Sequence, residues 1–143
     1  MTQRPLYETA QDQAGERETL QIICDRLQCQ AVKLPLNARA DYLLHTGGNA
    51  KTIIEIKHRT NSMGKYDTYM LSRGKYRALE NWSQMGFHAA IFVQWTDALG
   101  YVKVPTLHTT GRGGRYDRND PQDVEQVVYI PTCQFKIIQG ADL

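Results

Sequence analysis

The order of apolar and polar residues along the chain predicts two amphipathic helices. Residues 12–28 fit the first helix, because apolar positions recur at intervals of three and four and form one stripe. That stripe consists of Leu20, Ile23 and Leu27. A second helix is expected from Ser72, a suitable N-cap, to Gly86, where a left-handed residue can end it.

Short apolar runs, several of them rich in β-branched residues, predict strands between and after these helices. The runs are residues 31–36, 40–45, 52–58, 88–95, 101–104, 127–130 and 134–138. The turn sequence Thr46-Gly47-Gly48-Asn49 joins the second and third runs into a hairpin, and the last two runs are expected to close the fold as a pair. Residues 60–67 and the glycine-containing segment 109–126 are predicted loops. This order of elements predicts an α/β fold with a mixed sheet.

A single domain is expected over residues 1–143, with a core at about 12–104, the loop at about 109–126 and C-terminal strands at about 127–139. The composition, 41% apolar and 22% charged residues, does not fit a disordered or fibrous chain. The longest apolar run, residues 89–93, is far shorter than the roughly 18–20 residues of a membrane span. Three cysteines are too few for a disulfide framework, and the first residues do not resemble a signal peptide. We therefore expect a cytoplasmic protein, or one of the host cytoplasm if it is viral, without a membrane partner.

Basic residues are concentrated in two parts of the chain, although the net charge is only +2. Between Lys51 and Arg77 there are seven basic residues and two acidic ones. A second group, Arg112, Arg115 and Arg118, lies in the glycine-containing segment. A one-sided cationic surface attracts polyanions such as nucleic acids, but an ordinary solvated face has the same composition.

Glu16 lies on the apolar stripe of the first helix, four residues before Leu20. A carboxylate in that position is costly unless another group compensates its charge. Glu18 lies on roughly the opposite side, because two residues turn a helix by about 200°. The alternative is a helix that begins near residue 16, with Glu16 as an exposed acid of the first turn.

Two further carboxylates are expected near Glu16. Glu55 and Lys57 alternate along their predicted strand and share one face, and Asp41 lies at the start of the preceding strand. If the hairpin forms and the first helix packs on it, the three carboxylates converge. Two carboxylates about 4 Å apart repel by roughly 4 kcal/mol at an effective dielectric of 20, so the cluster requires a cation or raised pKa values. Hard oxygen ligands suit Mg²⁺ or Mn²⁺, and Lys57 beside the ion would position or deprotonate a water molecule.

Asp41 followed by Glu55-Ile56-Lys57 resembles the motif of the PD-(D/E)xK nuclease superfamily. The run Gly15-Glu16-Arg17-Glu18 is similar to the start of archaeal-type Holliday junction resolvases, in which the first of the two glutamates completes the site. The resemblance covers roughly residues 15–104. Ala40 departs from it, because it stands where the name-giving proline would be.

The resemblance implies a restriction-endonuclease-like fold with an α-β-β-β-α-β core and a C-terminal loop and strand extension. It implies a divalent-metal-dependent DNA endonuclease that resolves Holliday junctions or other branched DNA as a homodimer. Asp41, Glu55 and the Ile56 carbonyl would bind Mg²⁺ (or Mn²⁺), with Glu16 completing the set. Lys57 would activate water. The basic residues expected to contact DNA are His58, Arg59, Lys65, Arg73, Lys75, Arg112 and Arg115.

Two alternatives stay open at this point: a nuclease of the same superfamily that acts on other DNA structures or ends, and a nucleic-acid-binding module without catalysis. The four candidate groups argue against the second, because binding alone requires no acidic cluster beside a phosphate. The sequence Gly111-Arg112-Gly113-Gly114 lacks the Gly-Lys-Ser/Thr of a phosphate-binding loop, so no nucleotide cofactor is expected.

Overall fold

The structure, a computed structural model, describes residues 10–47, 49–114 and 124–140. Its two helices are α1 (Ala10–Leu27) and α2 (Arg73–Gln84). The strands are β1 (Gln30–Lys33), β2 (Tyr42–Thr46), β3 (Asn49–His58), β4 (Thr68–Ser72), β5 (His88–Gln94), β6 (Ala98–Val104), β7 (Thr109–Gly114), β8 (Val124–Pro131) and β9 (Lys136–Gly140). Short 3-10 helices cover Leu36–Ala38, Met63–Lys65 and Thr132–Gln134. Within these residues, neither α-helix is long and apolar enough to cross a membrane.

The strands form two sheets. The larger has six strands in the order β1-β2-β3-β5-β6-β9, and the smaller has three in the order β4-β8-β7. In the larger sheet β3 and β5 are parallel, and the other pairs are antiparallel. The predicted hairpin is confirmed, because β2 and β3 pair with Tyr42 opposite Ile54. The mixed α/β class is confirmed as well.

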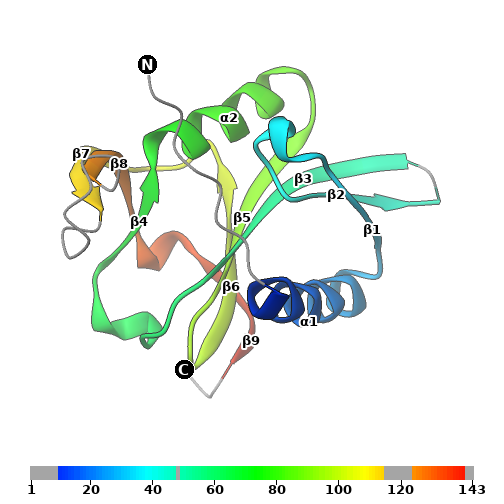
Figure 1. Cartoon of the computed structure of the whole chain (residues 1–143), viewed down its shortest axis with the longest axis horizontal. Coiled ribbons are helices and arrows are strands. Elements are labelled where there is room, and N and C mark those ends of the chain that lie inside the picture. The colour runs from blue at the N-terminus through cyan, green and yellow to red at the C-terminus, as the bar shows by residue number, and fades with distance from the viewer. Residues whose placement is uncertain (1–9, 48, 115–123, 141–143) are drawn as a thin grey trace.

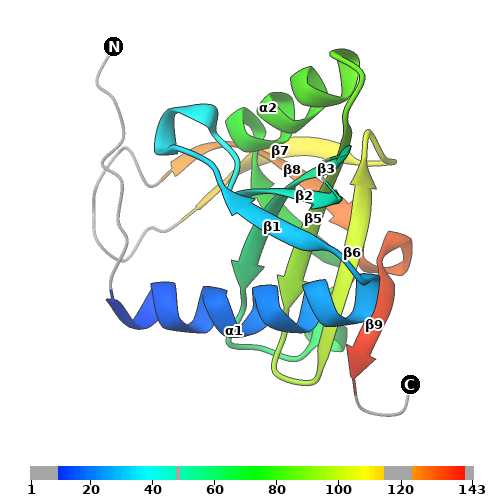
Figure 2. The ribbon, with the colours of Figure 1, turned by 90° about the vertical axis from the view of Figure 1, so that its right-hand side faces the viewer.

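The two helices cover opposite faces of the larger sheet (Figures 1 and 2). Under α1, the core contains Ile23 of that helix together with Ile54 and Ile56 of β3. On the other face, Ile53 of β3 packs in a core with Leu79 of α2. That core also contains residues of β4 and β8, so the smaller sheet and α2 cover the same face. Alternation along β3 therefore assigns its side chains to two separate cores.

The ends of α2 agree with the sequence pattern. The Ser72 hydroxyl accepts a hydrogen bond from the Lys75 amide (3.3 Å), as an N-cap does. After the helix, Gly86 has a φ of +100°, which glycine adopts without a steric penalty. In α1, Ile23 of the predicted stripe is fully buried, but Leu27 is 43% exposed. Leu27 is the last residue of its helix, where packing against the sheet ends.

The predicted loop over residues 109–126 is wrong in its described parts. Residues 109–114 form β7, and β8 begins at residue 124; residues 115–123, with Arg115 and Arg118, lie outside the described residues. The glycines of β7 allow close packing. A Cβ at Gly111 would lie 2.9 Å from the ring of Tyr129, and one at Gly113 would lie 2.6 Å from Met70 Sδ.

The expected closing pair of C-terminal strands is also wrong. β8 pairs with β4 and β7 in the smaller sheet, whereas β9 pairs with β6 in the larger one. The 3-10 helix Thr132–Gln134 lies between the two strands and connects the sheets. The apolar pattern of each strand shows that it is half-buried, but not which strand is its neighbour.

Candidate active site

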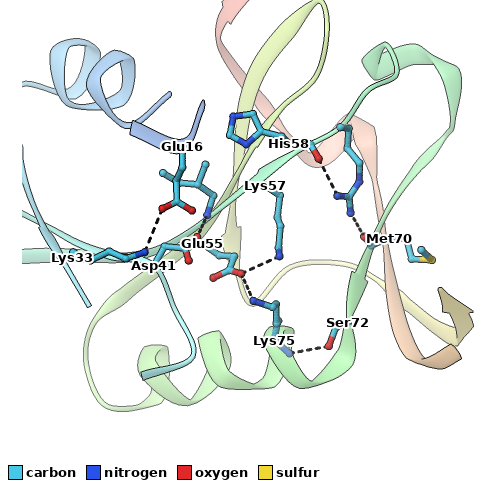
Figure 3. Close-up of polar contacts among 11 residues, drawn as sticks. Glu16, Lys33, Asp41, Glu55, Lys57, His58, Met70, Ser72 and Lys75 are labelled. Carbon is cyan, nitrogen blue, oxygen red and sulfur yellow. Dashed lines mark hydrogen bonds and ion pairs between the residues drawn. The ribbon is translucent and has the colours of Figure 1, made fainter. Parts of the chain in front are cut away.

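Glu55 is a buried acid in the middle of the larger sheet, only 1% exposed. It lies on β3, which pairs with β2 on one side and β5 on the other, and it faces α2 rather than solvent. Its Oε1 atom lies 2.6 Å from Lys75 Nζ and 3.4 Å from Lys57 Nζ (Figure 3). Its Oε2 atom is buried and has no hydrogen-bond partner among the described residues. A buried, unpartnered carboxylate oxygen is costly, and it is available to a cation.

Asp41 lies beside Glu55, immediately before β2. Its backbone N–H donates to the Ile54 carbonyl (2.9 Å), and its Oδ2 accepts from the Ile56 amide (2.7 Å). These two bonds fix the carboxylate against β3. Burial raises the pKa of Asp41 to about 7, and the nearby Glu55 carboxylate adds to this effect. The hydrogen bond from Ile56 opposes the rise only in part.

The pKa values of the two lysines that contact Glu55 are shifted in opposite directions. Burial lowers the pKa of Lys57, and the attraction of Glu55 offsets this only partly. Burial also opposes the charged form of Lys75, but the contact with Glu55 outweighs it and raises the pKa of Lys75. Lys57 therefore releases a proton more readily than Lys75 does.

Glu16 approaches the site from α1, on the other face of the sheet. Its Oε2 accepts from the Tyr42 hydroxyl (2.8 Å) and lies 3.3 Å from Lys33 Nζ. Its charge also contributes to the raised pKa of Asp41, and Figure 3 shows Glu16 beside Asp41. The alternative of an exposed first-turn acid is wrong, because α1 begins at Ala10 and the Glu16 side chain is only 17% exposed.

The expected convergence of three carboxylates is therefore incomplete. Asp41 and Glu55 lie together, whereas Glu16 is next to Asp41 and has its own partners. In the described parts of the chain, no three histidine, cysteine, aspartate or glutamate side chains could hold a metal ion together. The physical reason is that Glu55 and Glu16 reach the site from opposite faces of the sheet.

The residues at this point nevertheless fit a divalent metal ion. Asp41, the free Oε2 of Glu55 and the Ile56 carbonyl would supply hard oxygen ligands. Mg²⁺ is typically held by one or two carboxylates and keeps water molecules in its other positions. Two carboxylates and one carbonyl match that pattern, whereas Glu16 is bound by Tyr42 and Lys33 and acts on Asp41 through its charge.

Three of the basic residues predicted to contact DNA have partners within the chain. His58 Nε2 and Thr19 Oγ1 share a hydrogen bond (2.9 Å), which ties α1 to the end of β3. Arg59 donates to the Met70 carbonyl (2.9 Å), and its guanidinium lies 4.6 Å from the centre of the Tyr69 ring. Lys75 contacts Glu55, as described above. For these residues a role in DNA binding stays a prediction.

Of the other predicted DNA contacts, the three that the structure describes lie toward the surface. Arg73 donates to Gln126 Oε1 (2.7 Å), and Arg112 is exposed on β7. Arg73, Arg112 and Gln126 line the same shallow cavity of about 220 Å³. Lys65 is exposed, with Nζ 5.4 Å from the centre of the Tyr66 ring.

The sequence did not show that Lys75 belongs to the site. A lysine in the first turn of a helix is opposed by the helix macrodipole. Its presence three residues after the Ser72 N-cap was therefore a signal that a carboxylate lies nearby. The identity of that carboxylate, 20 residues earlier in the chain, is fixed only by the packing of α2 on the sheet.

A family model described as "Phage putative PDDEXK endonuclease" matches residues 2–138. The chain belongs to this family. The structure is similar to that of Archaeoglobus fulgidus Hjc, a Holliday junction resolvase from an archaeal hyperthermophile, with a TM-score of 0.57 and 16% sequence identity. The match covers 85% of this chain and 84% of the Hjc chain. No curated protein matches the chain.

These similarities confirm the restriction-endonuclease-like fold and the relationship to PD-(D/E)xK nucleases. Membership of the PDDEXK endonuclease family makes the protein a nuclease by class, and nucleases of this class generally use divalent metal ions. The roles of Asp41, Glu55 and Lys57 in the motif stay a prediction.

Proposed function

We propose that this protein is a divalent-metal-dependent DNA endonuclease that hydrolyses phosphodiester bonds and prefers branched DNA such as Holliday junctions. One observation carries the proposal. In a chain of the PDDEXK endonuclease family, the buried Glu55 keeps one oxygen free beside Asp41, while two lysines contact its other oxygen.

Asp41, Glu55 and the Ile56 carbonyl would hold the ion, which we expect to be Mg²⁺ or Mn²⁺. When bound, such an ion polarises the phosphate and makes water a stronger nucleophile at neutral pH. Lys57, which contacts Glu55, would orient the attacking water and offset the negative charge that develops on the phosphate. Glu16 acts on the site through its charge beside Asp41.

DNA would be held by contacts to its phosphates, which fix the register without reading sequence. Arg73 and Arg112, which line one cavity, are the best placed of the described basic residues. Lys65 is proposed to extend this surface, and for Arg115, which lies outside the described residues, a contact with DNA stays a prediction. His58 and Arg59 would support it by fixing the end of β3.

The preference for branched DNA is supported by the similarity to Hjc, a protein named as a Holliday junction resolvase. A four-way junction requires two paired incisions, so we propose that the protein acts as a homodimer. The open alternative is a nuclease for flaps, mismatches or ends on the same fold.

The test is cleavage of matched four-way junction, flap, duplex and single-stranded DNA with Mg²⁺, with Mn²⁺ and with chelator. We expect metal-dependent cutting that is fastest on the junction. Glu55→Gln should abolish cleavage while DNA affinity, measured by fluorescence anisotropy, changes less than about threefold. Glu18→Gln, at an exposed glutamate of α1, is the matched control and should cleave normally.

Full activity of the Glu55→Gln variant would refute the site. Tight binding without nicking, under either metal and on every substrate, would instead support a binding module without catalysis. Cleavage of all substrates at one rate would retain the nuclease and reject the preference for branched DNA.

A further inference from the structure

The two oxygens of Glu55 have unlike surroundings. Oε1 is contacted by two ammonium groups, with Lys75 at 2.6 Å and Lys57 at 3.4 Å. Oε2 has no hydrogen-bond partner among the described residues, although it is buried. The protein therefore neutralises one oxygen with its own cations and leaves the other for a ligand.

The position of Lys75 is fixed by the packing of α2 and by the N-cap of that helix. Its amide donates to the N-cap hydroxyl of Ser72, and Tyr76 and Leu79 of the same helix are buried against the sheet. Lys75 thus enters the site from α2, whereas Lys57 lies on β3 itself, two residues after Glu55. The two ammonium groups converge on one oxygen from different elements, as Figure 3 shows.

Charge counting limits how many metal ions this arrangement can accept. Asp41 and Glu55 are balanced by Lys57 and Lys75, and Glu16 is paired with Lys33. One divalent ion leaves the site with two positive charges, which an incoming phosphodiester and its attacking nucleophile can balance. A second ion would need Oε1 of Glu55, from which it would have to displace Lys75 against charge repulsion.

We propose that the ammonium group of Lys75 takes the place of the second metal ion used by two-metal phosphodiesterases, so that each chain binds one divalent ion. The inference rests on the proposed function and adds the number of ions and the role of Lys75. Lys75 then supplies the second positive charge against the phosphate during cleavage.

The test is calorimetric titration with Mn²⁺ alone, in the absence of DNA, on the full chain. We expect one ion per chain for the wild type. Lys75→Ala should bind that ion at least tenfold more tightly, because a positive charge that repels it has been removed, or should bind a second ion at Oε1 of Glu55. Lys103→Ala, at an exposed lysine of β6, is the matched control and should equal the wild type.

A second measurement separates this role from a merely structural one. In single-turnover cleavage of its preferred DNA, Lys75→Ala should be at least tenfold slower with little change in DNA affinity, and Lys75→Arg should recover part of the rate. Lys75→Gln keeps most of the side chain and provides the comparison if Lys75→Ala does not fold.

This inference would be overturned if the wild type bound two ions and cleaved DNA normally. The proposed function would then still stand. Unchanged Mn²⁺ affinity and stoichiometry in both Lys75→Ala and Lys75→Gln would do the same. A wild type that binds no Mn²⁺ would overturn the inference and the proposed function together.

Discussion

Asp41 should destabilise the metal-free fold at neutral and alkaline pH, and Asp41→Asn should relieve this cost. Burial and the nearby Glu55 raise the pKa of Asp41 from 3.8 to about 7, so the folded protein holds this proton more tightly than the unfolded chain does. The sign follows from this difference. The cost is absent below pH 3.8, grows as the pH rises to about 7, and is constant above that value.

A difference of about three pH units corresponds to about 4 kcal/mol at most, because one pKa unit is worth about 1.4 kcal/mol. Asparagine has nearly the same shape, and its amide oxygen can still accept the Ile56 hydrogen bond, although more weakly than a carboxylate. We therefore expect Asp41→Asn to be more stable than the wild type at pH 8 by about 1–3 kcal/mol. The advantage should shrink by roughly 2–3 kcal/mol when the pH is lowered to 5.

The assay is urea unfolding with chelator at pH 5, 6, 7 and 8, followed by circular dichroism. Asp25→Asn, at an exposed aspartate of α1, provides the control for a general change of charge. Adding Mn²⁺ at pH 8 should stabilise the wild type and not the Asp41→Asn variant. The argument from burial is refuted if the difference in unfolding free energy between the variant and the wild type is the same at pH 8 as at pH 5.

Two other predictions concern α1 and the smaller sheet. Glu16→Ala should slow cleavage, because it removes a charge beside Asp41, while Glu18→Ala should be nearly silent; equal rates of the two variants would contradict the orientation of α1. Gly113→Ala should lower the unfolding free energy by about 1–3 kcal/mol, because the new Cβ meets Met70 and Tyr129; a thermal denaturation curve identical to that of the wild type would contradict the close packing of β7.

The sequence predicted the parts of this fold that depend on local patterns. The β-branched run of β3, the turn that follows β2 and the caps of α2 are determined by neighbouring residues. The alternation of β3 also predicted that Glu55 and Lys57 share a face, and the hairpin register brings Asp41 beside Ile56.

The parts that the sequence did not predict depend on contacts between distant segments. The glycines of β7 led to the prediction of a loop. The reason for a residue without a Cβ atom in this strand is the close packing of Tyr129, which local sequence does not show. The sequence predicts that Lys75 of α2 contacts DNA, because its position in the first turn of the helix does not show which carboxylate it contacts. The contact of Arg59 could not be predicted for the same reason. Arg59 donates to the Met70 carbonyl, 11 residues away on β4, a strand that the sequence pattern did not predict.

The position of β3 between two paired strands has a consequence for how the protein loses its activity. Amides in such a strand are released only when β2 or β5 separates from it, and regions of this kind stay protected until the molecule opens as a whole. The Glu55 carboxylate is therefore expected to keep its position on β3 until the sheet itself unfolds. Heat should abolish the proposed activity no later than the temperature at which the larger sheet melts, and earlier only if α2, which supplies Lys75, separates from the sheet first.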